Sequence, residues 1–253
     1  MAGKKKKNSW RNRIICLVAE ILAVIALLLV LSQNFGFGYQ ITVWVNQLIK
    51  PAVKELDITG INSSYAVLMQ AGSGRVVGDI NGETPMYPAS MTKVMTVLVA
   101  AEQAEKNAIA AAENENTEID RQAVIENKLN EIVTITREAT DYSYVHDCST
   151  TGFLDGEQVP LRDVFNGTIL PSGGESAYQL ALYTAGSMEA FVDMMNQKAA
   201  ELGIGQTTHF ANPVGIYDEN NYSTAYDMAV IMQEAMQDLS LIHISEPTRL
   251  GMI

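Results

Sequence analysis

The chain has 253 residues, of which 47% are hydrophobic, and this is enough for one membrane segment and one sizeable core. Its formal charge of −12 is unevenly spread, because six of the 17 basic residues lie within the first thirteen positions and the other eleven face 29 acidic residues. A domain this acidic repels phosphates, so we exclude nucleic acid as a partner.

A basic tail, residues 1–13, precedes an apolar run over residues 14–31 whose only charge is Glu20. At eighteen residues, the run has about the minimum length for a membrane span. Because positive flanks stay in the cytoplasm, we expect residues 14–33 to be a single-pass anchor in the lipid bilayer, with the rest of the chain outside. A cleaved signal peptide is the alternative, although no convincing small-x-small cleavage site precedes Gln40.

The segment after the anchor, residues 34–62, is interpreted as a stalk that leads into a folded domain. Residues 65–69 and 76–80 have the pattern of strands, and the glycine-containing segment 71–75 between them predicts a turn. The domain is therefore expected to open with an antiparallel hairpin.

Helical patterns dominate the rest of the domain. A helix is predicted from Ser90 past Ala104, and residues 103–130, rich in Ala, Glu and Asn, are interpreted as an exposed insertion, helical or irregular, with a solvated face. A short strand is expected over residues 131–136. Further helical patterns cover residues 161–170, 172–185, 188–202 and 224–239.

The cysteines and histidines indicate neither a disulfide scaffold nor a metal centre. Cys16 lies in the predicted anchor and Cys148 in the outer domain, so the two cannot pair within one chain. His146, His209 and His243 lack metal-ligand spacing, and we predict no metal and no cofactor. His146 precedes Cys148 by two residues, so a Cys–His nucleophile is an alternative, although no third orienting group accompanies the pair.

The predicted helix at Ser90 begins with the sequence Ser-Met-Thr-Lys, in which Ser90 and Lys93 are three residues apart. Side chains at this spacing share one face of a helix. A buried, partly neutral lysine amine can take the proton of a serine hydroxyl, which makes the pair a candidate nucleophile and base. The alternative is a solvated helix with Lys93 as a surface lysine, because S-x-x-K also occurs by chance.

Several further motifs follow Ser90 in order: Gly156–Val164, Pro171–Ala177, Gly186–Asn196, Thr208–Ile216 and Tyr222–Ala229. In this order and wording they resemble the serine-type D-alanyl-D-alanine carboxypeptidases, the low-molecular-mass penicillin-binding proteins. The resemblance covers about residues 63–238, with residues 103–130 outside it.

The resemblance implies an α/β fold of the β-lactamase/transpeptidase type, with a helical subdomain beside an antiparallel sheet in a catalytic domain over residues 63–240. It implies a bacterial cell membrane protein whose domain lies on the extracytoplasmic side. The expected substrate is a peptidoglycan stem peptide ending in D-Ala-D-Ala, and β-lactam antibiotics are expected to bind as mimics of it.

The resemblance also implies roles for individual residues. Ser90 would be the nucleophile, Lys93 the base toward it, and Ser172 the relay that passes a proton to the leaving amine. The backbone N–H of Ser90 would stabilise the oxyanion. Ser172 could instead be only a helix N-cap, and residues 209–215 are interpreted as a structural turn under the site.

Two features depart from the family pattern. Gly174 stands where the S-x-N motif has Asn, so the side chain that helps to hold Lys93 and the substrate is missing, and Glu175 is a candidate to compensate for it. The family's K-T-G triad is also absent, since no Lys follows Lys198. The C-terminal sheet strands would then be missing, and we interpret residues 241–253 as unrelated sequence after a truncated frame. A genuine short homologue is the alternative.

Three functional hypotheses follow. The first is a membrane-anchored D,D-carboxypeptidase that acts through an acyl-enzyme on Ser90. The second is a non-catalytic protein that binds the cell wall or serves as a scaffold, which Gly174 and the absent K-T-G favour. The third is a class A-like β-lactamase, for which no deacylating Glu can be placed.

Overall fold

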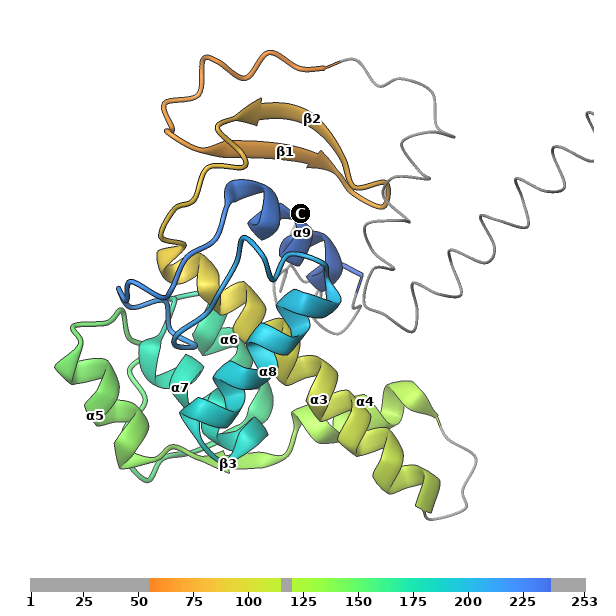
Figure 1. Cartoon of the computed structure of the whole chain (residues 1–253). Helices are drawn as coiled ribbons and strands as arrows, with labels where there is room; N and C mark the ends of the chain where they lie inside the picture. Colours follow the sequence, from red (N-terminus) through yellow and green to blue (C-terminus); the bar gives the residue numbers. More distant parts are fainter. Residues whose placement is uncertain (1–54, 115–119, 238–253) are drawn as a thin grey trace, which may run out of the picture.

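The computed structural model describes residues 55–114 and 120–237 (Figure 1). The predicted basic tail, the predicted anchor over residues 14–33 and the predicted unrelated segment 241–253 lie outside these ranges, as does most of the predicted stalk. Among the helices of the described part of the chain, none is long and apolar enough to cross a membrane.

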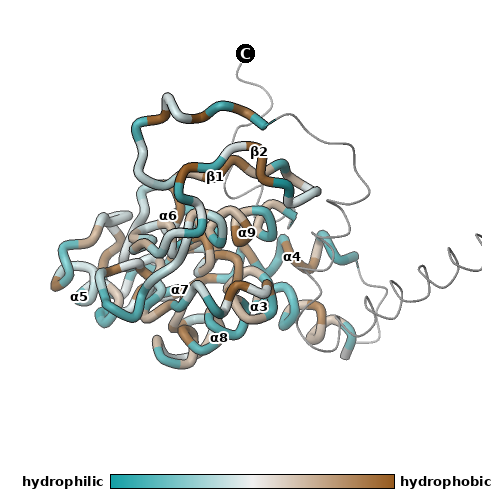
Figure 2. The backbone as a smooth tube through the Cα atoms, turned by 45° about the horizontal axis from the view of Figure 1, so that its top comes forward, coloured by the Kyte–Doolittle hydropathy of each residue, from teal (hydrophilic) through white to brown (hydrophobic). Residues whose placement is uncertain are grey.

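The predicted hairpin is present, within one residue of its expected bounds. Strand β1 (Ala66–Gln70) pairs antiparallel with β2 (Arg75–Ile80), and the register shifts between Leu68 and Met69. Both strands carry hydrophobic residues (Figure 2), and β1 packs against helix α9 (Ala225–Ala235), which lies beneath the hairpin in Figure 1. Since an isolated two-stranded hairpin is marginally stable in water, this packing on α9 is what stabilises it.

The other described elements form a helical layer with a second short sheet. The helices are α3 (Thr92–Asn114), α4 (Arg121–Leu129), α5 (Arg137–Val145), α6 (Leu161–Ile169), α7 (Gly174–Ala185) and α8 (Met188–Glu201). The short sheet pairs β3 (Ile132–Thr134) with β4 (Gln158–Pro160), antiparallel. The predicted strand over residues 131–136 and the predicted helices over 161–170, 172–185, 188–202 and 224–239 are confirmed, each with slightly shorter bounds.

Two elements were not predicted, and both have weak patterns. Helix α5 buries only Ala139 and Ser143, so its sequence shows no apolar stripe. Strand β4 has three residues and ends at Pro160, which cannot donate to a sheet. The solvated character predicted for residues 103–130 holds for α4, which has no buried residue.

Helix α3 is the central element of the domain. The 3₁₀ turn η1 (Ala89–Met91) leads into it, so helical structure begins close to the predicted start at Ser90. Nearly all of its first ten residues are buried, and it packs against α6, α7, α8 and α9. The start of α3 is therefore fixed from several sides, and the side chains of its first turn have little freedom to move.

Candidate active site

The predicted pair of Ser90 and Lys93 meets at the start of α3. Ser90 lies in η1 and is exposed, whereas Lys93, one turn on, is 3% exposed. The Lys93 Nζ donates hydrogen bonds to Ser90 Oγ at 3.3 Å and to the carbonyl oxygen of Val214 at 2.8 Å. The alternative of a surface lysine is therefore wrong, because the amine is enclosed and directed at the serine hydroxyl.

The surroundings of Lys93 favour its neutral form. Burial lowers the pKa of its amine below the ordinary value of 10.5, because a desolvated cation is costly. Cys148 and Glu175 act in the opposite direction, since their negative forms would attract the cation. Loss of water outweighs these attractions, so Lys93 gives up its proton more readily than an exposed lysine and can accept one from Ser90.

The turn that carries Val214 is held by Asn212. The side-chain Oδ1 of Asn212 accepts from the backbone N–H groups of Val214, Gly215 and Ile216 at 3.2, 2.7 and 3.0 Å. Gly215 has φ of 84°, and a Cβ there would overlap the carbonyl group of Ala89 beside the nucleophile. This turn packs against η1 and fixes the carbonyl that orients Lys93, in line with the structural role that the sequence indicated.

Ser172 has a buried hydroxyl that makes no hydrogen bond within the described residues. The N-cap of α7 is Gly173, without a side-chain cap, so the alternative that Ser172 is the helix N-cap is wrong. Ser172 also has φ of 61°, a left-handed conformation that costs a non-glycine residue about 1–3 kcal/mol. Within the described residues, this hydroxyl is therefore a buried polar group without a structural role that the hydrogen bonds explain.

The side chain of Glu175 binds the loop before β4, so it is not directed at Lys93 as the missing Asn side chain would be. Its carboxylate is 2% exposed and accepts from the backbone N–H groups of Thr151 and Gly152 at 2.6 and 2.9 Å. The hydroxyl of Ser143, on α5, donates to its other oxygen at 3.3 Å. Glu175 therefore ties the loop to the first turn of α7.

Cys148 and Ser143 are neighbours of the site that the sequence did not indicate as members of it. Cys148 is close enough to Lys93 for their charges to interact, although 54 positions separate them in the chain. Burial raises the pKa of the Cys148 thiol, which is the reverse of what a thiolate nucleophile needs. His146 lies against the ring of Tyr142, with ring centroids 4.5 Å apart. The hypothesis of a Cys–His nucleophile is therefore wrong.

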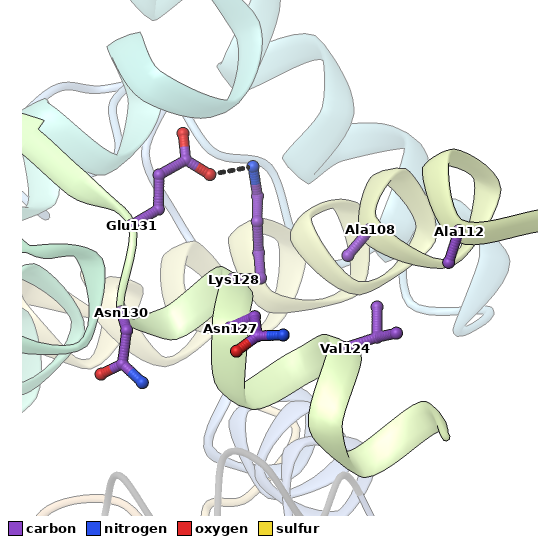
Figure 3. Close-up of a pocket in the computed structure, with 7 residues that line it drawn as sticks. All are labelled: Ala108, Ala112, Val124, Asn127, Lys128, Asn130 and Glu131. Carbon is purple, nitrogen blue, oxygen red and sulfur yellow. Dashed lines mark hydrogen bonds and ion pairs between the residues drawn. The ribbon is translucent and has the colours of Figure 1, made fainter. Parts of the chain in front are cut away.

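A hollow of about 450 Å³ between α3 and α4 belongs to another part of the surface (Figure 3). Alanine and asparagine side chains line most of it, and its Lys128 is paired with Glu131 at 2.6 Å. None of the residues discussed above contributes to it. It offers no nucleophile beside a base, so we assign it no part in the chemistry.

A serine hydroxyl beside a buried lysine amine, at the start of a central helix, is the arrangement found in acyl-transfer enzymes that use a serine nucleophile. Comparison with known proteins identifies the family of the chain. Residues 51–248 match the family described as D-alanyl-D-alanine carboxypeptidase, and the chain belongs to this family. Its members are serine-type D-Ala-D-Ala carboxypeptidases, as the resemblance implied.

Curated relatives support the assignment. The chain is 32% identical over 176 residues to the D-alanyl-D-alanine carboxypeptidase DacF of Bacillus subtilis. The aligned region covers 68% of this chain and 38% of the relative. It is 32% identical over 191 residues to DacA of Escherichia coli, and that aligned region covers 75% of this chain and 41% of the relative. The chain thus spans about two fifths of the length of these relatives.

Solved structures show the same fold. The carboxypeptidase DacD from Francisella tularensis superposes with a TM-score of 0.60 at 25% identity, over 79% of this chain and 43% of that protein. The DD-transpeptidase of Streptomyces K15 gives a TM-score of 0.60 at 26% identity, over 78% of this chain and 68% of that protein. The described residues adopt the penicillin-binding fold, with helices beside small antiparallel sheets.

The lowered pKa of Lys93 predicts how acylation of Ser90 depends on pH. The base must be neutral, so the acylation rate with a penicillin should rise with pH through a midpoint below 10.5 and then level off. Lys93→Arg, which stays charged, should lower this rate by about 100-fold or more, as the loss of a general base does. A flat profile, or an active Lys93→Arg variant, would contradict the assignment of Lys93 as base.

The buried, unpartnered hydroxyl of Ser172 predicts that its removal affects turnover without lowering stability. Removing such a group costs no internal hydrogen bond, so Ser172→Ala should leave the free energy of unfolding unchanged or raise it by about 1 kcal/mol. Turnover should nevertheless fall if the hydroxyl serves the substrate. Chemical denaturation and D-alanine release measure the two effects. A variant that is less stable but equally active would show a structural role only.

Proposed function

We propose that this protein is a D,D-carboxypeptidase that removes the terminal D-alanine from peptidoglycan stem peptides through an acyl-enzyme on Ser90. The hydrogen bond of 3.3 Å between Ser90 Oγ and the buried Lys93 amine is the observation that carries the proposal. Ser90 is exposed just before α3, where the end of a peptide chain can reach it, and the Lys93 amine beneath it is shielded from water.

In the proposed reaction, Ser90 Oγ attacks the carbonyl carbon of the penultimate D-alanine while Lys93 Nζ takes the hydroxyl proton. The amide C–N bond then breaks, and the proton held by Lys93 passes through the Ser172 hydroxyl to the departing amine of the last D-alanine. Water hydrolyses the acyl-enzyme and restores the Ser90 hydroxyl. The backbone N–H of Ser90, ahead of α3, would stabilise the oxyanion.

β-Lactams would acylate Ser90 in the same way. Their ring amide takes the place of the scissile peptide bond, and its opening leaves the departing nitrogen attached to the acyl group. That group blocks the path of water, so the adduct would persist. This gives a direct assay of the nucleophile without the natural substrate.

A fluorescent penicillin should label the full-length protein covalently, and Ser90→Ala should abolish the label. Ser63→Ala is a matched control, because Ser63 is exposed and lies before β1, so labelling should be unchanged. Gel fluorescence and intact mass measure the adduct. Absence of labelling in the folded full-length protein would overturn the proposal.

The second candidate, a non-catalytic protein that binds the cell wall, is favoured by Gly174, which lacks the side chain of the family's Asn. It predicts binding to peptidoglycan that Ser90→Ala leaves unchanged, with no release of D-alanine. A pull-down with purified cell wall, run beside the D-alanine assay, separates the two functions.

We also propose that residues 14–33 anchor the protein in the bacterial cell membrane with the folded domain on the extracytoplasmic side. The single-charge apolar run and the basic residues before it support this orientation. Removal of residues 1–33 should move the protein from the membrane fraction to the soluble fraction. A full chain that is already soluble would contradict the proposal.

A further inference from the structure

The space beside Gly174 is already filled by another residue. A Cβ built on Gly174 would lie 2.6 Å from the Cβ of Cys148 and 3.0 Å from its Sγ, and 2.9 Å from the Oγ of Ser143. Approaches under 3.0 Å essentially never occur between real side chains, so no residue larger than glycine fits here without a shift of its neighbours. The Asn of the family motif is therefore excluded by Cys148, with Ser143 as the second contact.

Cys148 is held in this position by the backbone. Its N–H donates to the carbonyl oxygen of Ser143 at 3.0 Å, and the N–H of Gly174 donates to the carbonyl oxygen of Ser149 at 2.8 Å. The carboxylate of Glu175 accepts from Thr151 and Gly152, further along the same loop. The loop is thus attached to the first turn of α7 directly after Cys148, which restrains Cys148 from moving away to admit a side chain at position 174.

The thiol also faces the charged groups of the site. Lys93 lowers the pKa of Cys148, but burial raises it more, and Glu175 and Asp147 raise it further. Burial raises the pKa of Tyr142 on α5 to about 12, and Cys148 adds to this increase. Burial also keeps the Cys148 thiol neutral at physiological pH, so that an apolar sulfur packs against Gly174.

We propose that Cys148 is a positioning residue that takes the place of the missing side chain at position 174 and holds the first turn of α7 in place. Gly174 and Cys148 form a matched pair, in which the small residue on α7 makes room for the larger one on the loop. The consequence for catalysis rests on the proposed function, whereas the packing of the pair and its proximity to Lys93 do not.

A double-mutant cycle tests the packing. Gly174→Asn alone should lower the melting temperature and reduce the rate of acylation by a penicillin at least about tenfold, because its Cβ meets Cys148. Cys148→Gly in the same chain should recover most of both losses, and Cys148→Gly alone controls for the added backbone freedom. A Gly174→Asn variant as stable and active as the wild type, or a double variant no better than Gly174→Asn, would overturn the proposal.

The positioning role is tested by the pH profile of acylation. The negative form of Cys148 raises the pKa of Lys93, so Cys148→Ala should move the midpoint downward, further from the ordinary value of a lysine, 10.5. Cys148→Ser, which keeps the size of the side chain but stays uncharged, should move it in the same direction. A structural role alone would lower stability and leave the midpoint in place, and that result would overturn the positioning role.

A readout without catalysis separates this proposal from the proposed function. In a Cys16→Ser background of the full-length protein, the reaction of Cys148 with a small aromatic disulfide reports how the thiol ionises. Lys93→Met should move this reaction to higher pH, since the cation that lowers the pKa of the thiol is gone. An unchanged midpoint would show that the two groups are not neighbours, whether or not the protein binds penicillin.

Discussion

The buried amine of Lys93 is the feature on which the site depends. Its two recorded hydrogen bonds have different purposes: the carbonyl of Val214 fixes the position of the nitrogen, and Ser90 Oγ is the group on which it acts. Since a lysine is rarely buried without a partner, the fold must keep that amine satisfied and dry at the same time. The helices around the first turn of α3 and the turn at Asn212 are the elements that do so.

The second requirement is a fixed loop over the same helix start. The buried carboxylate of Glu175 accepts hydrogen bonds from two backbone N–H groups and thereby attaches the loop that carries Cys148 to α7. Burying a carboxylate costs free energy, and hydrogen bonds to its oxygens are needed to offset that cost. Ala89, next to the nucleophile, has φ of 47°, and Ser172 has φ of 61°; such left-handed conformations persist only where the surrounding packing stabilises them.

Much of the architecture was predictable from the sequence, because it rests on local patterns. The hairpin has two apolar strands around a glycine turn, and Ser90 and Lys93 meet because three residues bring side chains to one helix face. Contacts between distant segments were not predictable. Nothing in the sequence indicates that the Val214 carbonyl binds Lys93, 121 residues away, or that Cys148 fills the space at Gly174. The sequence shows the missing side chain at position 174, and only the fold shows what occupies its place.

The central claim is that Lys93 carries a neutral amine at a pH where other lysines are charged. Nuclear magnetic resonance of the full-length protein, with ¹³C at the lysine Cε, measures this directly and needs no activity. We expect one lysine to titrate with a midpoint clearly below 10.5, and its signal to be absent in Lys93→Met. If every lysine titrates near 10.5, Lys93 is solvated and charged, and the account of Ser90 activation is wrong.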